Sequence, residues 1–339
     1  MSDVSIRGYR AGDEHGIVDL FHRRFHPERT LEHWRWKFRD HPLGRGLVSV
    51  AVDRHGGISA HCAGYPTLLV DARPRSDPGT PQALPCLHIG DVMADPCAVR
   101  AGLSGSVFES TFRHLRQQVR SADMPFMYGV AAGAIDRFYA RKMQRGTVAP
   151  IAYWRCAPVP FAERIQLTGA DNHGLSVERV ERPTVEFDEL FHRVGARYGV
   201  LARRDAAYVG WRYSGCPDRV HCVYTLRSGG RIAGWSVFRR VGSRLVWGDA
   251  LIDPAHADGT ALLLDEALRR QGAGRVDVVE AWFPAHPDWW ERQLDRLGFT
   301  TSDEPQGLKL VYVCATGEPV DPSQMAGSLY YTMGDTDLF

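Results

Sequence analysis

No apolar run in this sequence approaches the length of about 20 residues that a membrane-spanning helix needs, and the first residues lack the apolar core of a signal peptide. Cys-x-x-Cys pairs are also missing: the seven cysteines are scattered, and their odd number argues against a disulfide framework. These absences favour a cytoplasmic protein with reduced thiols, no membrane partner and no metal site.

An excess of charge of one sign is lacking as well. Lys and Arg together number 41, against 40 Asp and Glu, which gives no electrostatic argument for a nucleic-acid or anionic-membrane partner. The chain of 339 residues is too long for one ordinary core and suits two domains of roughly 150 residues each. With 44% hydrophobic and 24% charged residues, its composition is that of a globular protein.

One stretch organises the first half of the chain. Residues 89–94 are mostly apolar and end in Asp95-Pro96, a short turn with one arginine and two glycines follows, and residues 107–119 are amphipathic. This order predicts a strand, a turn and a helix whose N-terminus is open. Unpaired N–H groups and the positive end of the helix dipole suit a phosphate there, although an ordinary helix start has the same pattern.

Three local matches recur in the same order and predict an internal duplication. Each pairs a segment of the first half with one about 150 to 175 residues later. The matched pairs are Trp36-Lys37-Phe38 with Trp211-Arg212-Tyr213, Gly90-Asp91-x-x-x-Asp95-Pro96 with Gly248-Asp249-x-x-x-Asp253-Pro254, and Phe138-Tyr139 with Trp289-Trp290. The repeat predicts an N-terminal domain over residues 1–160 and a C-terminal domain over residues 161–339.

The predicted halves differ at the turn. The second half has no arginine after its Asp-Pro, and Asp258 stands where a phosphate would lie. Because like charges repel, the second half should bind pyrophosphate poorly.

The strand, the Arg-x-Gly-Leu-x-Gly turn, the long helix and the later helix with Phe138-Tyr139 resemble the acyl-CoA core of the GCN5-related N-acetyltransferase (GNAT) superfamily, and the duplication resembles its tandem members. The resemblance implies an α/β (α+β) fold of two GNAT-like domains, each a mixed, mostly antiparallel sheet flanked by helices. It implies that the N-terminal domain binds acetyl-CoA as a co-substrate and that the C-terminal domain is degenerate.

The resemblance also implies roles for residues of the first half. Tyr139 would protonate the leaving thiolate, in a direct transfer within a ternary complex. Backbone groups would hold the pantetheine arm at Val92, Met93 and Ala94, and the pyrophosphate at Arg100, Ala101, Gly102, Leu103, Ser104 and Gly105.

The general base is open between His88 and Asp91. A regular strand would place these two residues on opposite faces, and a β-bulge would change that. Asp91 recurs as Asp249 in the predicted degenerate half, which favours a structural role for it. Asp335 and Asp337 would reach a cationic amine if the polar end of the chain folds back over a cleft, or they form a solvated tail.

Trp36 is a further candidate for substrate binding, although the matching Trp211 favours helix packing instead. The expected reaction is N-acetylation of a small amine, such as an amino sugar or a specialised metabolite, in a cleft between the halves of a monomer or homodimer. Two alternatives stay open: a non-catalytic acyl-CoA or metabolite-binding protein, and an aminoacyl transferase acting on a cell-wall precursor. The near-zero net charge counts against the second alternative.

Overall fold

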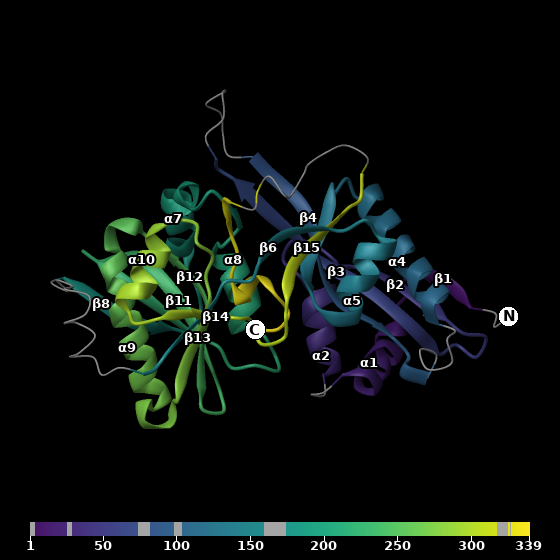
Figure 1. Ribbon diagram of the computed structural model, residues 1–339, viewed down its shortest axis with the longest axis horizontal. Coiled ribbons are helices and arrows are strands. Elements are labelled where there is room, and N and C mark those ends of the chain that lie inside the picture. The colour runs from purple at the N-terminus through teal and green to yellow at the C-terminus, as the bar shows by residue number, and fades with distance from the viewer. Residues whose placement is uncertain are drawn as a thin grey trace.

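The computed structural model describes residues 4–25, 29–73, 82–97, 104–158, 174–316, 325 and 327–339. Two β-sheets lie next to each other, each with helices packed on it, and the closing segment, residues 327–339, runs between them (Figure 1). Most strand pairs in both sheets are antiparallel. The predicted α/β architecture of two mixed, mostly antiparallel sheets is confirmed.

The first sheet is built mainly from the first half of the chain. Its strands in spatial order are β1 (Ser5–Gly8), β2 (Leu47–Val52), β3 (Ile58–Asp71), β4 (Gln82–Ala94), β5 (Phe126–Ala131), β15 (Lys309–Cys314) and β6 (Gly146–Pro150), with β9 (Val200–Ala202) on β3 and β16 (Leu329–Tyr330) on β9. Its helices are α1 (Asp13–Arg24), α2 (Leu31–Trp34), the π-helix η1 (Arg35–Arg39), α4 (Ser104–Ser121) and α5 (Gly133–Lys142).

The second sheet repeats this plan. Its strands in spatial order are β14 (Thr300–Ser302), β7 (Tyr153–Cys156), β13 (Val278–Trp282), β12 (Arg244–Ile252), β11 (Arg231–Val241), β10 (Cys222–Ser228) and β8 (Leu175–Val180). Its helical elements are α7 (Val185–Val194), η2 (Gly195–Tyr198), α8 (Ala206–Val209), the π-helix η3 (Gly210–Ser214), η4 (Pro254–Gly259), α9 (Thr260–Gln271), η5 (Ala273–Arg275) and α10 (Trp289–Arg296); η7 (Met333–Asp335) lies in the closing segment.

The two halves exchange strands. β15, from the end of the chain, lies between β5 and β6 in the first sheet, and β7, from the first half, lies between β13 and β14 in the second sheet. The predicted domain boundary at residue 160 lies outside the described residues. It separates most elements of the two sheets, but not β7 and β15, nor β9 and β16, which lie in the first sheet although they come from the second half of the chain.

Helices cover both faces of the first sheet for reasons that the sequence contains. On α4, Phe112, Leu115 and Val119 recur at helical spacing and are fully buried, so this helix packs one apolar stripe against the sheet. On the opposite face, α1 buries Ile17 and Leu20. The β4 strand between these layers therefore has helices on both sides.

The duplication recurs in the local structure. In both halves a short helix starts at a side-chain cap and continues into a π-helix: Thr30 accepts a hydrogen bond from His33 N (3.1 Å), and Asp205 accepts one from Tyr208 N (2.8 Å). Trp36 of η1 and Trp211 of η3 then stack at 4.9 Å between ring centroids. The repeated motif thus meets its own copy at the interface of the halves.

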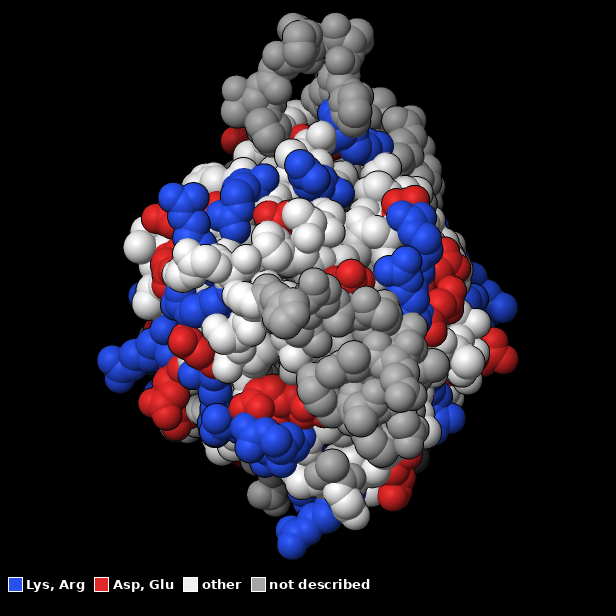
Figure 2. Space-filling model, turned by 90° about the vertical axis from the view of Figure 1, so that its left-hand side faces the viewer, with Lys and Arg blue, Asp and Glu red and all other residues white. Residues whose placement is uncertain are grey.

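Charges of both signs are mixed over the face of the second half that Figure 2 shows. Ion pairs in that half include Arg227 with Glu186 and Arg269 with Glu266. No described helix is long and apolar enough to cross a membrane.

Candidate active site

Strands β4 and β5 form a splay in the first sheet. In the described part of the chain they pair only at Leu87–Met127 and His88–Tyr128, although β4 continues to Ala94 and β5 to Ala131. Backbone N–H and C=O groups on the facing edges therefore have no strand partner. Because buried backbone groups need hydrogen-bond partners, such an edge suits an extended ligand arm.

A β-bulge in β4 lies at the mouth of this splay. Asp91 has a φ of 53°, and the register against β3 shifts between His61 and Ala63. The backbone carbonyl of Asp91 lies 2.7 Å from Nδ1 of His61, which fixes the bulge from the neighbouring strand. A regular strand would place His88 and Asp91 on opposite faces unless a bulge intervened. The structure has such a bulge, and the bulge reorients the Asp91 side chain.

The Asp91 carboxylate is held by two buried cations. Its Oδ2 pairs with Arg29, and its Oδ1 lies 3.0 Å from Nζ of Lys37, which is 1% exposed. Burial raises the pKa of Asp91, but Arg29 and Lys37 outweigh it and hold the pKa well below its usual range. A carboxylate paired on both oxygens is suited to fixing geometry more than to taking a proton.

Lys37 joins Asp91 to the closing segment. Its Nζ also lies 2.9 Å from Oδ2 of Asp337, and a Cβ placed on Gly90 would lie 3.1 Å from that same oxygen. Burial raises the pKa of Asp337, but the Lys37 ammonium outweighs burial and lowers it to about 2. The closing segment therefore places a negative charge over the bulge, in space that opens because residue 90 has no side chain.

His88 lies beside the Lys37–Asp337 pair and is buried. Its ring stacks on Tyr65 at 4.8 Å and meets Tyr128 edge-on at 5.2 Å, and neither ring nitrogen has a hydrogen-bond partner among the described residues. Burial lowers the pKa of His88 to about 3, although Asp337 acts in the opposite direction. The imidazole is neutral near pH 7 and offers one acceptor nitrogen.

Tyr139 lies on the other face of the sheet. It belongs to α5, is 3% exposed and packs against Phe112 at 5.1 Å. Burial raises its pKa well above the usual value, and Cys62 and Asp337 raise it further. Tyr139 packs with Phe112 and Met127, whereas His88 packs against Tyr65 and Tyr128, so the two side chains have different neighbours around the first sheet.

The remaining residues predicted for the cofactor fall into three groups. Met93 and Ala94 pair with β3 through His61 and Ala60, which leaves the other edge of this segment, including Val92, toward the splay. Ser104 and Gly105 form the first residues of α4. The others lie outside the described residues: Arg100, Ala101, Gly102 and Leu103.

Trp36 mainly joins the two halves. Its indole N–H donates to the backbone oxygen of Trp211 (2.8 Å), and that of Trp211 donates back to Trp36 (3.1 Å). Trp36 also lines a small pocket with Lys37, Arg212 and Asp337. Its position is thus compatible with packing and with contact to a ligand at Asp337.

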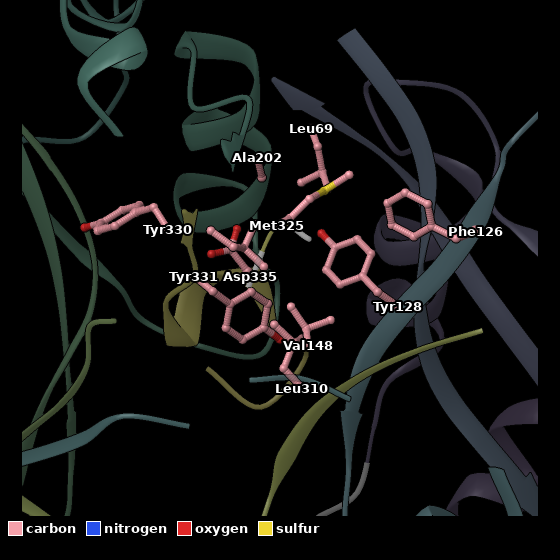
Figure 3. A pocket seen from close by; sticks show the side chains of 11 residues that line it. Leu69, Phe126, Tyr128, Val148, Ala202, Leu310, Met325, Tyr330, Tyr331 and Asp335 are labelled. Atoms are coloured by element: carbon pink, nitrogen blue, oxygen red, sulfur yellow. The ribbon is translucent and has the colours of Figure 1, made fainter. Parts of the chain in front are cut away.

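Asp335 lies apart from the splay. Its Oδ2 accepts from Arg204 at 2.5 Å, and Arg204 also donates to Asp249 at 3.0 Å. Its Oδ1 has no partner among the described residues. Asp335 lines an aromatic pocket between the halves together with Tyr128 and Tyr331 (Figure 3). Burial raises the pKa of Asp335 despite Arg204. The structure therefore does not bring Asp335 and Asp337 to one site.

An open groove lies between the halves. Its walls come from both of them, with His41, Tyr65 and Thr67 on one side and Arg203 and Tyr208 on the other. Tyr65 separates the groove from His88, on which it stacks.

Sequence reasoning did not single out the cations of this site, Arg29 and Lys37, or the aromatic wall at Tyr65. A signal for Lys37 was present, because the repeated motif carries a basic residue in both copies, as Lys37 and as Arg212.

No protein-family profile and no curated protein matches the sequence. Solved structures do match the fold. A GCN5-related N-acetyltransferase from Anabaena variabilis has a TM-score of 0.62 and 13% identity, covering 92% of this chain and 73% of its own. A tandem GNAT protein from the clavulanic acid biosynthesis pathway has a TM-score of 0.59 and 14% identity, covering 94% and 100%. The N-myristoyltransferase of Saccharomyces cerevisiae with bound myristoyl-CoA has a TM-score of 0.60 and 13% identity, covering 93% and 83%. At these identities the likeness concerns the fold, and the chain has the tandem GCN5-related N-acetyltransferase fold.

Proposed function

We propose that this protein is an acyl-CoA-dependent N-acyltransferase that uses acetyl-CoA to acetylate the amine of a small molecule, such as an amino sugar or a specialised metabolite. The observation that carries the proposal is the splay of β4 and β5 beyond His88 and Tyr128, with α4 following β4 in the chain. A structural relative, the yeast N-myristoyltransferase, holds myristoyl-CoA, which supports an acyl-CoA ligand for this fold.

The residues present fit an acyl-CoA. The free edge of residues 92–94 would pair with the amide groups of a pantetheine arm, and the N–H groups at the start of α4 would hold the pyrophosphate. A Cβ placed on Gly105 meets nothing within 4 Å, so this position has room for a side chain. The turn of residues 100–103 would complete the phosphate cradle.

The acceptor amine would enter through the groove between the halves and reach the splay past Tyr65. Asp337 would attract the amine as a cation and hold it at the bulge, with the edge of Trp36 beside it. Asp91 would act by positioning, because Arg29 and Lys37 occupy its oxygens. Asp335, in its separate pocket, would contact a more distant polar group of the acceptor.

The bound thioester supplies an activated acyl carbonyl. The amine nitrogen, after losing its ammonium proton to solvent, attacks this carbonyl, and the C–S bond breaks as the amide forms. His88 accepts the second proton from nitrogen as the C–N bond forms, a stage at which that proton is acidic enough for a weak base. Tyr139 donates its phenolic proton to the leaving thiolate and regains one from solvent.

The phosphate cradle is tested by Gly105→Glu with Gly105→Gln as the matched neutral control. Glu at the start of α4 should favour the helix, because a negative charge suits the dipole there, while it repels a pyrophosphate. We expect calorimetry to show about tenfold weaker acetyl-CoA binding for the Glu variant than for the Gln variant, or about 1.4 kcal/mol. Equal affinities would reject this placement of the cofactor.

Release of CoA in the presence of a panel of amines tests catalysis. Amine-dependent release supports the transferase. Tight acetyl-CoA binding without turnover on every amine would favour the non-catalytic acyl-CoA-binding protein. Turnover only with an aminoacyl donor would favour transfer to a cell-wall precursor.

A further inference from the structure

The two halves have equivalent glycines at the mouth of their splays. Gly90 and Gly248 each precede the aspartate of the repeated motif, and in both strands the register against the neighbouring strand shifts at this point. In the second sheet, β12 pairs in parallel with β13 up to Trp247–Ala281, just before Gly248. The second half therefore retains a counterpart of the splay.

Different side chains of the closing segment fill the space over these two glycines. Over Gly90 lie Nζ of Lys37 and Oδ2 of Asp337, 2.8 Å and 3.1 Å from a Cβ placed there. Over Gly248 lies the ring of Phe339, which such a Cβ would overlap. The same short segment thus occupies both positions, with a carboxylate in the first half and an aromatic ring in the second.

Two arginines of the second half fix the backbone between these side chains. Arg212 donates to the backbone oxygens of Thr336 (2.5 Å) and Phe339 (2.8 Å). Arg219 donates to those of Asp337 (3.0 Å) and Phe339 (2.5 Å). The position of Asp337 is therefore set by its attachment to the second half.

The Phe339 ring is itself enclosed. It is 1% exposed and lies against His221 and Tyr213, at 4.9 Å and 6.0 Å between ring centroids, with the guanidinium of Arg239 at 5.4 Å from its centroid. A Cβ at position 248 would take up the space that this ring uses. The Phe339 ring therefore fits because residue 248 has no side chain.

We propose that the degenerate splay of the second half is a socket for Phe339, and that seating this ring positions Asp337 at the acceptor site of the first half. The proposal rests on the proposed function, in which Asp337 attracts the amine. It makes Phe339 a positioning residue that acts from the other half. It also assigns one acyl-CoA to each chain, because the ring occupies the second splay.

The socket is tested from both sides with Phe339→Ala, which removes the ring, and Gly248→Ala, which displaces it. With the amine that gives turnover, both variants should raise the KM for the amine about tenfold and leave the acetyl-CoA affinity within twofold of the unchanged protein. The matched controls are Leu338→Ala, at an exposed neighbour, and Gly274→Ala, where a Cβ meets nothing within 4 Å. Both controls should retain the original KM.

A double variant separates positioning from general loss of stability. If Phe339 acts through Asp337, Phe339→Ala added to Asp337→Asn should raise the KM no further than Asp337→Asn alone. The proposal would be overturned if the KM increases of the two single variants multiplied in the double variant, or if Phe339→Ala left the KM unchanged. Calorimetric binding of two acetyl-CoA molecules per chain would overturn the claim that the Phe339 ring fills the second splay.

A measurement without any ligand keeps this test independent of the proposed function. Hydrogen exchange of the amides at residues 335–338 should become at least tenfold faster in Phe339→Ala and Gly248→Ala but not in the two controls. Unchanged exchange would reject the socket even if the protein is a transferase. Faster exchange in a protein that binds no acetyl-CoA would retain the socket and reject the function.

Discussion

The two halves carry the same buried ion pair and use it differently. In the first half Arg29 pairs with Asp91, and in the second Arg204 pairs with Asp249, with both members at the matched positions of the repeat. Asp91 has a second cation, Lys37, which also reaches Asp337. The comparison indicates that the pair belongs to the scaffold, and that the extra charges around it make the first half the candidate for chemistry.

The second carboxylate is surrounded by different groups. Asp249 accepts from the Tyr213 hydroxyl at 2.6 Å and shares Arg204 with Asp335. Tyr213 stands at the position of Phe38, and the space over the neighbouring Gly248 is filled by Phe339. Both carboxylate oxygens of Asp249 thus have partners within this half, and the Phe339 ring fills the space beside them.

The starts of the helices that follow β4 and β12, α4 and α9, also differ. In the second half the turn before α9 is a 3-10 helix, and a Cβ at its last residue, Gly259, would overlap Leu226. Asp258 in this turn pairs with Arg296 at 3.4 Å. In the first half a Cβ at Gly105 meets nothing within 4 Å. The duplication retained the fold in both copies, and the glycine near each helix start has different surroundings in the two halves.

The largest expected effect comes from breaking the shared ion pair in each half. Asp91→Asn leaves Arg29 and Lys37 with one carboxylate fewer, and Asp249→Asn leaves Arg204 with Asp335 alone. Removing one partner of a buried pair costs about 3–5 kcal/mol, so both variants should lose stability on this scale, Asp91→Asn the more. Urea unfolding followed by circular dichroism gives the two values. A larger loss for Asp249→Asn would reverse the ranking of the halves.

The next effect concerns the helix that follows each splay, where Tyr139 of α5 corresponds to Trp290 of α10. Tyr139→Phe removes only a hydroxyl and should lower turnover about a hundredfold, the lower end of what a general acid contributes, with acetyl-CoA affinity unchanged. Trp290→Phe removes volume from the second core, where the indole stacks on Phe283 at 4.4 Å, and should lower Tm without changing turnover. Equal turnover in Tyr139→Phe and the unchanged protein would remove Tyr139 from the mechanism.

Much of this comparison could be predicted from the sequence. The repeated motifs predicted two matching domains, and the strand, turn and helix over residues 89–119 predicted β4 and α4. Local patterns of alternation and helical spacing sufficed for these elements. The strand exchange of β7 and β15 was not predictable in this way, because alternation shows that a segment is a strand and not which sheet edge it joins.

The site was predictable only in part for the same reason. His88 and Asp91 were predicted from the strand that leads to the cofactor turn, and Tyr139 was predicted from the resemblance of a later helix. Lys37 was missed because its partner Asp337 lies 300 residues away, and no local spacing reports such a contact. Asp335 and Asp337 were treated alike because they are neighbours in the sequence, whereas the chain carries them to different halves.

The smallest effect uses those two neighbours, whose pKa values shift in opposite directions. Lys37 lowers the pKa of Asp337 from 3.8 to about 2 against the effect of burial, so its contribution to stability is present above pH 3.8 and is lost as the pH falls through about 2. Burial raises the pKa of Asp335 above 3.8, so its contribution to stability is present below pH 3.8 and is lost as the pH rises through the folded value.

Asp337→Asn should therefore flatten the fall in unfolding free energy between pH 4 and 2, and Asp335→Asn should flatten the fall above pH 4, each by at most about 1.4 kcal/mol per pH unit. Urea titrations at a series of pH values measure both slopes. The opposite signs arise because the two carboxylates have different partners, Lys37 for Asp337 and the crowded Arg204–Asp249 pair for Asp335. If both variants change the profile in the same pH range and with the same sign, the closing segment does not divide its two carboxylates between the halves.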